Sequence, residues 1–282
     1  MRPKSKQVRC LQYILMALIA VVSLFPFYAL VTVGTNPPDF SVLNGDVFAP
    51  TLYFENYKEA WDVSHLGSAM MNSLTITGGS LFILLFVSAN AAYAISRFPN
   101  KLNRSVYTVF MLGMMIPPIV NTVPLYTVMQ RIGGINTRWA MILLMAANCM
   151  PLTTFLYVGF IRAIPRQFEE AAILDGCSWH GAFWRVIFPQ LKPVTATAII
   201  MNGVSIWNNY GQAIFFLQKR KVHTIPISIS IFYQTYGAKW HLMAAAAIIG
   251  MIPALIVFLL FQKSFIKGLV RRNQRVKAGE QH

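Results

Sequence analysis

Apolar residues gather into six long stretches along the chain, and polar or charged positions separate one stretch from the next. The hydrocarbon core of a bilayer takes about 20 apolar residues per helix, and each stretch reaches that length. The pattern therefore predicts an all-α, polytopic protein of the cell membrane with six transmembrane helices and both termini on one side. The predicted spans are residues 11–34, 71–96, 105–129, 139–161, 194–217 and 242–262.

Positive charge indicates which side is cytoplasmic. Of the 24 Lys and Arg residues, 17 fall in the two termini and in the second and fourth connections, against 7 on the other side. By the positive-inside rule the side with 17 is cytoplasmic. The cluster Lys219–Lys221 runs against this rule. The predicted organisation is a cytoplasmic N-terminus (1–10), a first span (11–34), an extracytoplasmic loop (35–70), a permease domain (71–265) and a basic cytoplasmic tail (266–282).

Composition agrees with a chain solvated by lipid, since 56% of the residues are hydrophobic and only 12% are charged. The net charge of +15 is spread over short flanks of apolar stretches, which argues against a nucleic-acid-binding surface. The chain has no G-x-x-x-x-G-K-[ST] loop and no catalytic constellation, so we expect no enzymatic activity and no bound cofactor. The three scattered cysteines indicate neither a disulfide framework nor a metal site.

A polar segment interrupts the apolar pattern between residues 169 and 189, with the sequence EEAAILDGCSWHGAFWRVIFP. Three of the nine acids fall here, so the segment must lie in water. Pro165 at a first helical position and Gly176 at a left-handed cap predict a helix of about three turns. Ser178 is expected to cap a second short helix that Pro189 and Pro193 close. The alternative is an amphipathic segment lying along the headgroups.

This polar segment resembles the E-A-A-x-x-x-G-x(9)-I-x-L-P loop of the permeases of ABC importers. Val186 and Phe188 replace the usual Ile and Leu. The resemblance extends over most of the chain and is closest to the smaller, six-helix permease of the maltose-type carbohydrate uptake systems. Further matching pieces are Asn72-Ser73-Leu74, the run from Ala92 to Phe98, Ile116-Pro117-Pro118, Trp207-Asn208, and Pro253 through Lys267-Gly268.

The resemblance implies that residues 163–190 form a loop that docks on a separate cytoplasmic ATPase, which carries the ATP and magnesium. It also implies a sugar or oligosaccharide as substrate, alternating access as mechanism, and three kinds of partner: a second permease in a heterodimer, two ATPase subunits and an extracytoplasmic sugar-binding protein. The candidate coupling residues are Phe168, Glu169, Glu170, Ala171, Ala172, Asp175, Gly176, Val186, Phe188 and Pro189. Within this loop, Phe168, Ala171, Ala172 and Asp175 are spaced to form one helix face, which we expect to pack against the partner.

Polar residues within the predicted spans are candidates for a substrate pathway. Asn202, Ser205 and Asn209 fall at i, i+3 and i+7, and such a stripe can bind sugar hydroxyls. The alternative is that these side chains hydrogen-bond neighbouring helices. The full candidate set is Asn121, Tyr126, Asn202, Ser205, Trp207, Asn208, Asn209, Tyr210 and Gln212.

Two other functions remain open at this point. An ion-coupled secondary transporter is disfavoured because every Asp and Glu falls outside the six predicted spans, although backbone carbonyls can hold sodium. A membrane interaction protein without transport activity is the other alternative.

Overall fold

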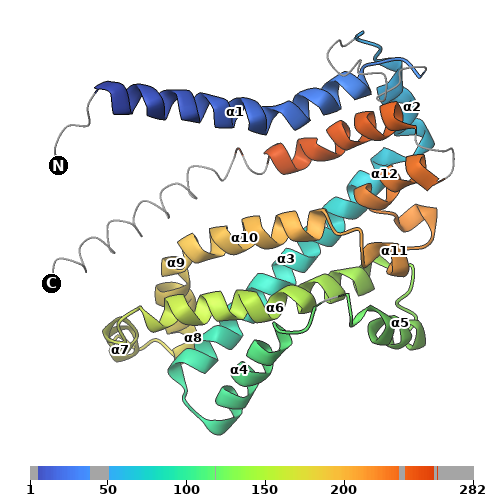
Figure 1. The fold of residues 1–282 in the computed structure, drawn as a ribbon. Helices are drawn as coiled ribbons and strands as arrows, with labels where there is room; N and C mark the ends of the chain where they lie inside the picture. The colour runs from blue at the N-terminus through green and yellow to red at the C-terminus, as the bar shows by residue number, and fades with distance from the viewer. Residues whose placement is uncertain (1–5, 39–50, 118, 235–238, 257–258, 260–282) are drawn as a thin grey trace. The chain divides into compact units, whose positions relative to one another are not determined.

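The computed structural model describes residues 6–38, 51–117, 119–234, 239–256 and 259, and every regular element in these ranges is helical (Figure 1). Within the described ranges no β-strand occurs, in agreement with the predicted all-α fold. The predicted basic tail, the end of the predicted sixth span and Pro118 lie outside the described residues. The chain divides into two units, one of residues 1–67 with 228–252 and one of residues 68–227 with 253–282.

Three helices in the described part are long and apolar enough to cross a membrane. They are residues 11–34 of α1 (Lys6–Gly34), α3 (Leu66–Arg97) and α6 (Arg138–Arg162). These helices coincide with the first, second and fourth predicted spans. A shorter apolar helix, Trp240–Ile256, begins the sixth.

The third predicted span is divided in two at Pro117. Helix α4 (Lys101–Gly113) ends before Pro117, and α5 (Thr122–Arg131) begins after it. Proline removes a backbone donor and clashes with the preceding turn, so an α-helix does not continue through it without distortion.

The fifth predicted span, which we expected to be one helix, is also divided. Helix α10 (Lys192–Trp207) stops at Asn208, and the single-turn α11 (Ala213–Phe216) follows. The Oδ1 atom of Asn209 accepts a hydrogen bond from the backbone N–H of Ala213 at 3.1 Å. Asparagine side chains compete in this way for backbone groups and favour turns over helix interiors. The hydropathy pattern did not predict this break, because the segment is apolar on both sides of it.

The smaller unit is built around the end of α1, helix α2 (Glu55–Val63), part of α12 (Ile225–Gln234) and the helix Trp240–Ile256. Its core consists of Ala60, Leu66, Phe232, Leu242, Ala245 and Ala246. Asn56 is fully buried, and its Nδ2 donates to the carbonyl oxygens of Gly34 at 3.0 Å and Asn36 at 2.7 Å. These bonds fix the end of α1 to α2, because helix-terminal carbonyls need partners when buried.

The larger unit is organised around α6, against which α4 and α10 pack. Close approach between α3 and α6 depends on Gly79, where an added Cβ would lie 2.9 Å from the Ile142 side chain. The neighbouring Ser80 donates from its hydroxyl to the Ile142 carbonyl at 3.1 Å. Two apolar clusters fill the unit, one around Met141 and Leu144 and the other around Tyr157 and Ile161. Helices α3 and α6 thus form a rigid frame that positions the polar segments at either end.

Candidate functional site

The predicted acidic helix of the polar loop is present but shorter than expected. Helix α7 covers Gln167–Leu174, eight residues, and carries both Glu169 and Glu170 in its first turn. The chain then turns at Gly176, which has a φ of +89°. Its N–H donates to the Ile173 carbonyl at 2.9 Å. Only glycine adopts this backbone conformation without strain, so the predicted glycine corner is confirmed.

The second half of the loop is a chain of short helical pieces. These are α8 (Trp179–Ala182), a π-helix η3 (Phe183–Ile187) and α9 (Phe188–Gln190). Ser178 caps the first piece as predicted, since its Oγ accepts a hydrogen bond from the Gly181 N–H at 3.1 Å. The expectation that Pro189 and Pro193 end this helix is wrong. They lie in the first turns of α9 and α10, where a missing N–H removes no helical hydrogen bond.

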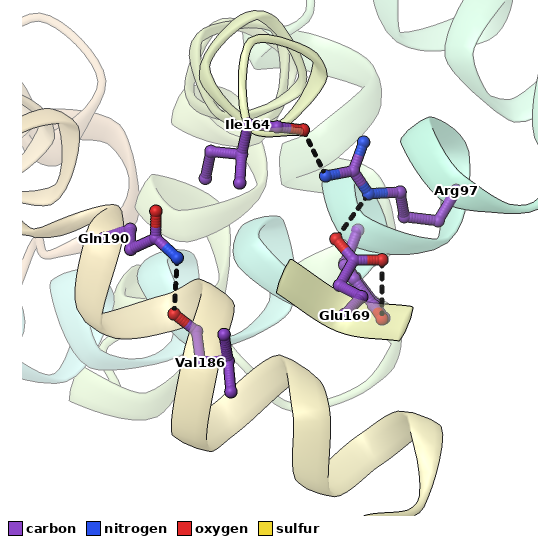
Figure 2. A network of polar contacts seen from close by, with 6 residues as sticks. Arg97, Ile164, Glu169, Val186 and Gln190 are labelled. Carbon is purple, nitrogen blue, oxygen red and sulfur yellow. Dashed lines mark hydrogen bonds and ion pairs between the residues drawn. The ribbon is translucent and has the colours of Figure 1, made fainter. Parts of the chain in front are cut away.

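Glu169 points into the protein instead of outward (Figure 2). It is only 2% exposed, and its Oε1 lies 2.6 Å from Nε of Arg97 on α3. Nη2 of Arg97 also donates to the Ile164 carbonyl at 2.9 Å. The Tyr93 hydroxyl donates to the second Glu169 oxygen at 3.5 Å. The guanidinium therefore joins α3 to both the end of α6 and the first turn of α7.

The opposite side of the loop presents acids and large apolar groups to the outside. Glu170 and Asp175 are exposed, Phe168 is 51% exposed and Leu174 is 87% exposed. The predicted face of Phe168, Ala171, Ala172 and Asp175 is divided, because Ala172 alone of these is buried. The side of α7 that is exposed is therefore not the helix face that the residue spacing predicted.

Aromatic rings attach the second half of the loop to α3. The rings of Tyr93 and Phe183 lie 4.7 Å apart, and those of Phe86 and Trp184 lie 5.7 Å apart. Val186 and Phe188 are half-buried and pack against the same apolar cluster. These two predicted coupling residues consequently help to seat the loop on the protein's own core. Pro189 is exposed.

A polar pocket of about 330 Å³ lies between α6, α10 and the segment that follows α10. It brings together four of the predicted pathway residues, Asn202, Ser205, Asn209 and Gln212. Asn148 of α6 joins them, and its Nδ2 donates to Oε1 of Gln212 at 2.8 Å. The remaining lining residues are apolar or weakly polar: Met145, Cys149, Leu152, Met201 and Ile206. None of the described residues that line the pocket is charged.

Five predicted pathway residues lie elsewhere. Trp207 is buried, Asn208 is exposed, and Tyr126 and Tyr210 pack beside the apolar cluster around Met141. Asn121 immediately precedes α5. The alternative role in helix contacts applies to Asn202, whose Nδ2 donates to Oγ1 of Thr153 on α6 at 3.0 Å. Among the described residues no group of His, Cys, Asp and Glu is arranged to hold a metal ion.

The helical frame, the anchored acidic loop and the polar pocket define a membrane permease component. The chain belongs to the family of binding-protein-dependent transport system inner membrane components, whose model matches residues 85–271. It is 40% identical to the melibiose/raffinose/stachyose import permease protein MelC of Bacillus subtilis over 91% of this chain and 93% of that protein.

Solved structures share the fold. The chain matches a bacterial ABC transporter involved in the import of the acidic polysaccharide alginate, with a TM-score of 0.79 and 20% identity over 94% of this chain and 100% of that one. A second match is a bacterial alginate ABC transporter in complex with an alginate pentasaccharide-bound periplasmic protein. Here the TM-score is 0.59 and the identity 17%, over 90% of this chain and 93% of that one.

Proposed function

We propose that this chain is the permease subunit of an ATP-driven importer for a neutral sugar or oligosaccharide, working by alternating access. Family membership and the likeness to a melibiose/raffinose/stachyose import permease support this function. Its partners are a second permease, two ATPase subunits that bind ATP and magnesium, and an extracytoplasmic sugar-binding protein. The chain itself binds no nucleotide and no metal.

The observation that carries the proposal is the two-sided construction of the loop 163–190. On its inner side Glu169 is bound to Arg97, so the loop moves together with α3. On its outer side Phe168, Glu170 and Leu174 are exposed and available to another protein. A segment held rigidly to a long helix and open on its other face is suited to transmit movement from a partner into the membrane.

Typical interaction free energies indicate which contacts provide the coupling. Shifting a two-state transporter from 1:99 to 99:1 needs about 5.5 kcal/mol of differential interaction. An exposed ion pair supplies about 0–1 kcal/mol. Glu170 alone is therefore insufficient, and apolar burial of Phe168 and Leu174 against the ATPase is the larger contribution. Fully burying one such side chain is worth about 1.5–3 kcal/mol.

The length of α6 supports placing its two ends on opposite sides of the membrane. Helix α6 has 25 residues and is therefore about 37 Å long, which exceeds the hydrocarbon thickness of about 30 Å. The coupling loop follows its Arg162 end, and the loop of residues 132–137 precedes its Arg138 end. With the coupling loop in the cytoplasm, the loop of residues 132–137 lies on the extracytoplasmic side.

The pocket suits hydroxyl groups better than charged ones. Amide side chains both donate and accept hydrogen bonds, as sugar hydroxyls do, and no described lining residue carries a charge that would neutralise an acidic substrate. Its volume is near the lower end of small-molecule sites, about 300 Å³, so it accommodates one sugar ring at a time. We propose that Asn148, Ser205, Asn209 and Gln212 line part of the substrate pathway.

The test is uptake of radiolabelled raffinose into proteoliposomes that contain the complete importer and its binding protein. We expect uptake to require enclosed ATP and to persist when ionophores collapse the proton and sodium gradients. Uptake that continues without ATP and stops with the ionophores would establish the ion-coupled alternative instead. Absence of any stable association with an ATPase subunit would favour the interaction protein without transport activity.

A further inference from the structure

Asn202 on α10 has both hydrogen-bond donors of its side chain engaged inside the protein. Its Nδ2 donates to Oγ1 of Thr153 on α6 at 3.0 Å and to the Ala198 carbonyl, one turn earlier on α10, at 2.8 Å. An amide nitrogen carries two hydrogens, so neither is left for another group. Through its nitrogen, the Asn202 side chain therefore joins α10 to α6.

The chemistry around the Asn202 nitrogen fixes the orientation of the amide. The Thr153 hydroxyl donates to the Cys149 carbonyl at 2.8 Å, so its single proton is engaged and its oxygen can only accept from Asn202. The Ala198 carbonyl is also only an acceptor. An amide turned the other way would place Oδ1 against two acceptors, and the hydrogen-bond network excludes this. Thr153 is fully buried, so water does not relieve the constraint.

The oxygen of the same amide is left for the pocket. Asn202 is only 6% exposed, and it lines the pocket of about 330 Å³. Within the described residues no group donates to its Oδ1, and this atom is not closed off from solvent. A nearly buried carbonyl oxygen without a partner is unfavourable, so its position favours a ligand that donates a hydrogen bond to it.

The other amides of the pocket do not have a polarity fixed in this way. Asn148 donates from Nδ2 to Oε1 of Gln212 at 2.8 Å. A bond between two amides does not by itself determine which of them donates, because both carry a donor and an acceptor. Asn202 differs because two groups that can only accept surround its nitrogen.

We propose that Oδ1 of Asn202 accepts a hydrogen bond from one hydroxyl group of the transported sugar. Asn202 is then a specificity-determining residue, and Thr153 is the residue that positions it. The inference rests on the proposed function, which supplies the sugar. It combines the two roles considered for asparagines in the spans, since the nitrogen of Asn202 contacts a helix and its oxygen contacts the substrate.

The experiment measures the maximum rate of ATP-driven uptake into proteoliposomes that contain the complete importer. The sugars are raffinose and raffinose analogues that each have one hydroxyl replaced by fluorine, which cannot donate a hydrogen bond. Sugar-loaded binding protein is supplied at saturating concentration, so its different affinities for the sugars do not affect the maximum rate. In the wild type, at least one analogue should be imported about tenfold more slowly than raffinose, because one hydrogen bond is lost.

Asn202→Leu keeps the approximate size of the side chain and removes the acceptor. The Thr153 hydroxyl keeps its bond to the Cys149 carbonyl, so it is not left without a partner. The variant should import raffinose about tenfold more slowly than the wild type does, and it should import raffinose and the affected analogue at equal rates.

Thr153→Val tests the positioning role. It leaves Asn202 in place but removes the acceptor that orients the amide, so the amide can turn. The difference in rate between raffinose and the affected analogue should become smaller. A purely structural role for Thr153 would lower both rates by the same factor and leave their ratio unchanged.

Asn90→Leu is the matched control. Asn90 on α3 donates from Nδ2 to the Phe86 carbonyl, one turn earlier, at 2.7 Å, just as Asn202 donates to the Ala198 carbonyl. Asn90 does not line the pocket. This variant should keep the wild-type ratio between raffinose and every analogue.

Two results would overturn the inference. The first is that the wild type imports every analogue as fast as raffinose. The second is that the affected analogue keeps its full disadvantage in Asn202→Leu, because effects that simply add belong to independent sites. If Asn202→Leu does not reach the membrane, an unchanged ratio in Thr153→Val decides against the inference. Absence of ATP-driven raffinose uptake by the wild type would instead contradict the proposed function itself.

Discussion

Arg97 and Glu169 are 72 positions apart in the sequence, yet the Arg97 Nε and Glu169 Oε1 atoms lie 2.6 Å apart in a site closed to water. The neighbouring acid, Glu170, is exposed. Two adjacent glutamates of the coupling loop therefore have different environments. The first attaches the loop to its own protein, and the second is left for a partner.

The buried pair predicts a large effect on stability. Arg97→Ala leaves the Glu169 carboxylate buried without its partner, and breaking a buried ion pair in this way costs about 3–5 kcal/mol. We expect a marked fall in the thermal unfolding temperature of the detergent-purified importer. Uptake should fall further than ATP hydrolysis, because the loop is no longer attached to α3.

Glu170→Gln is the matched control for this prediction. It neutralises the adjacent acid at an exposed position, where an ion pair contributes about 0–1 kcal/mol. The unfolding temperature should stay near that of the wild type, while affinity for the ATPase subunit falls. Equal unfolding temperatures for Arg97→Ala and the wild type would show that the pair does not secure the loop.

The glycine corner gives a second prediction. Gly176 has a φ of +89°, and a side chain there costs about 1–2 kcal/mol even though no atom of a described residue lies within 4 Å of the added Cβ. We expect Gly176→Val to insert into the membrane but to separate ATP hydrolysis from uptake, because the corner opens and misplaces α7 relative to α8. The ratio of sugar imported to ATP hydrolysed measures this coupling.

Gly159→Val is a suitable control for the corner. Gly159 lies within α6 and has no positive φ, and in the described part of the chain no atom lies within 4 Å of an added Cβ there. The variant should keep the wild-type ratio. Normal coupling in Gly176→Val would show that the left-handed corner is dispensable.

The pocket gives a third prediction. Ser205→Trp should fill much of the 330 Å³ volume and reduce uptake about tenfold or more, without lowering the amount of importer in the membrane. The adjacent Val204 is exposed and does not line the pocket, so Val204→Trp should import normally. Equal uptake rates for the two tryptophan variants in proteoliposomes would argue against a pathway through this pocket.

His223 gives a prediction for pH. Partial burial lowers its pKa below the ordinary 6.5, and the nearby Arg220 adds to this effect, while a hydrogen bond to the Gln218 carbonyl opposes it. The folded protein therefore binds the proton more weakly than the unfolded chain does. The stabilisation is complete above about pH 6.5 and is lost as the pH falls toward the lowered pKa. The unfolding temperature of the wild type should fall more over this range than that of His223→Gln.

Local signals were sufficient to predict much of the architecture. Apolar length identified α1, α3 and α6, and Pro117, Gly176 and Ser178 marked a break, a corner and a cap that the structure contains. Each of these features depends on a few neighbouring residues, so the sequence shows them directly.

Features that depend on tertiary contacts were missed. The residue pattern predicted the helix around Glu169 but not which side of that helix faces the protein interior. The inward side is determined by the contact between Glu169 and Arg97, which is far away in the sequence. The sequence showed Arg97 only as a cation of the second connection and as part of the run from Ala92 to Phe98, with no link to Glu169. The stripe of Asn202, Ser205 and Asn209 was assigned to one helix, yet the helix ends before Asn209, and all three still reach one pocket.

The π-helix Phe183–Ile187 gives the coupling loop one residue more than an α-helix needs over the same turn. Deleting one residue inside this turn would restore ordinary α geometry and leave the residues on either side near their present orientation. A deletion within α10 has no such surplus residue to absorb it, so everything before the deletion would rotate by about 100° relative to the rest of α10. The aromatic seat of the loop would then be lost even though every remaining side chain is intact. A single-residue deletion should therefore be tolerated better within Phe183–Ile187 than within α10.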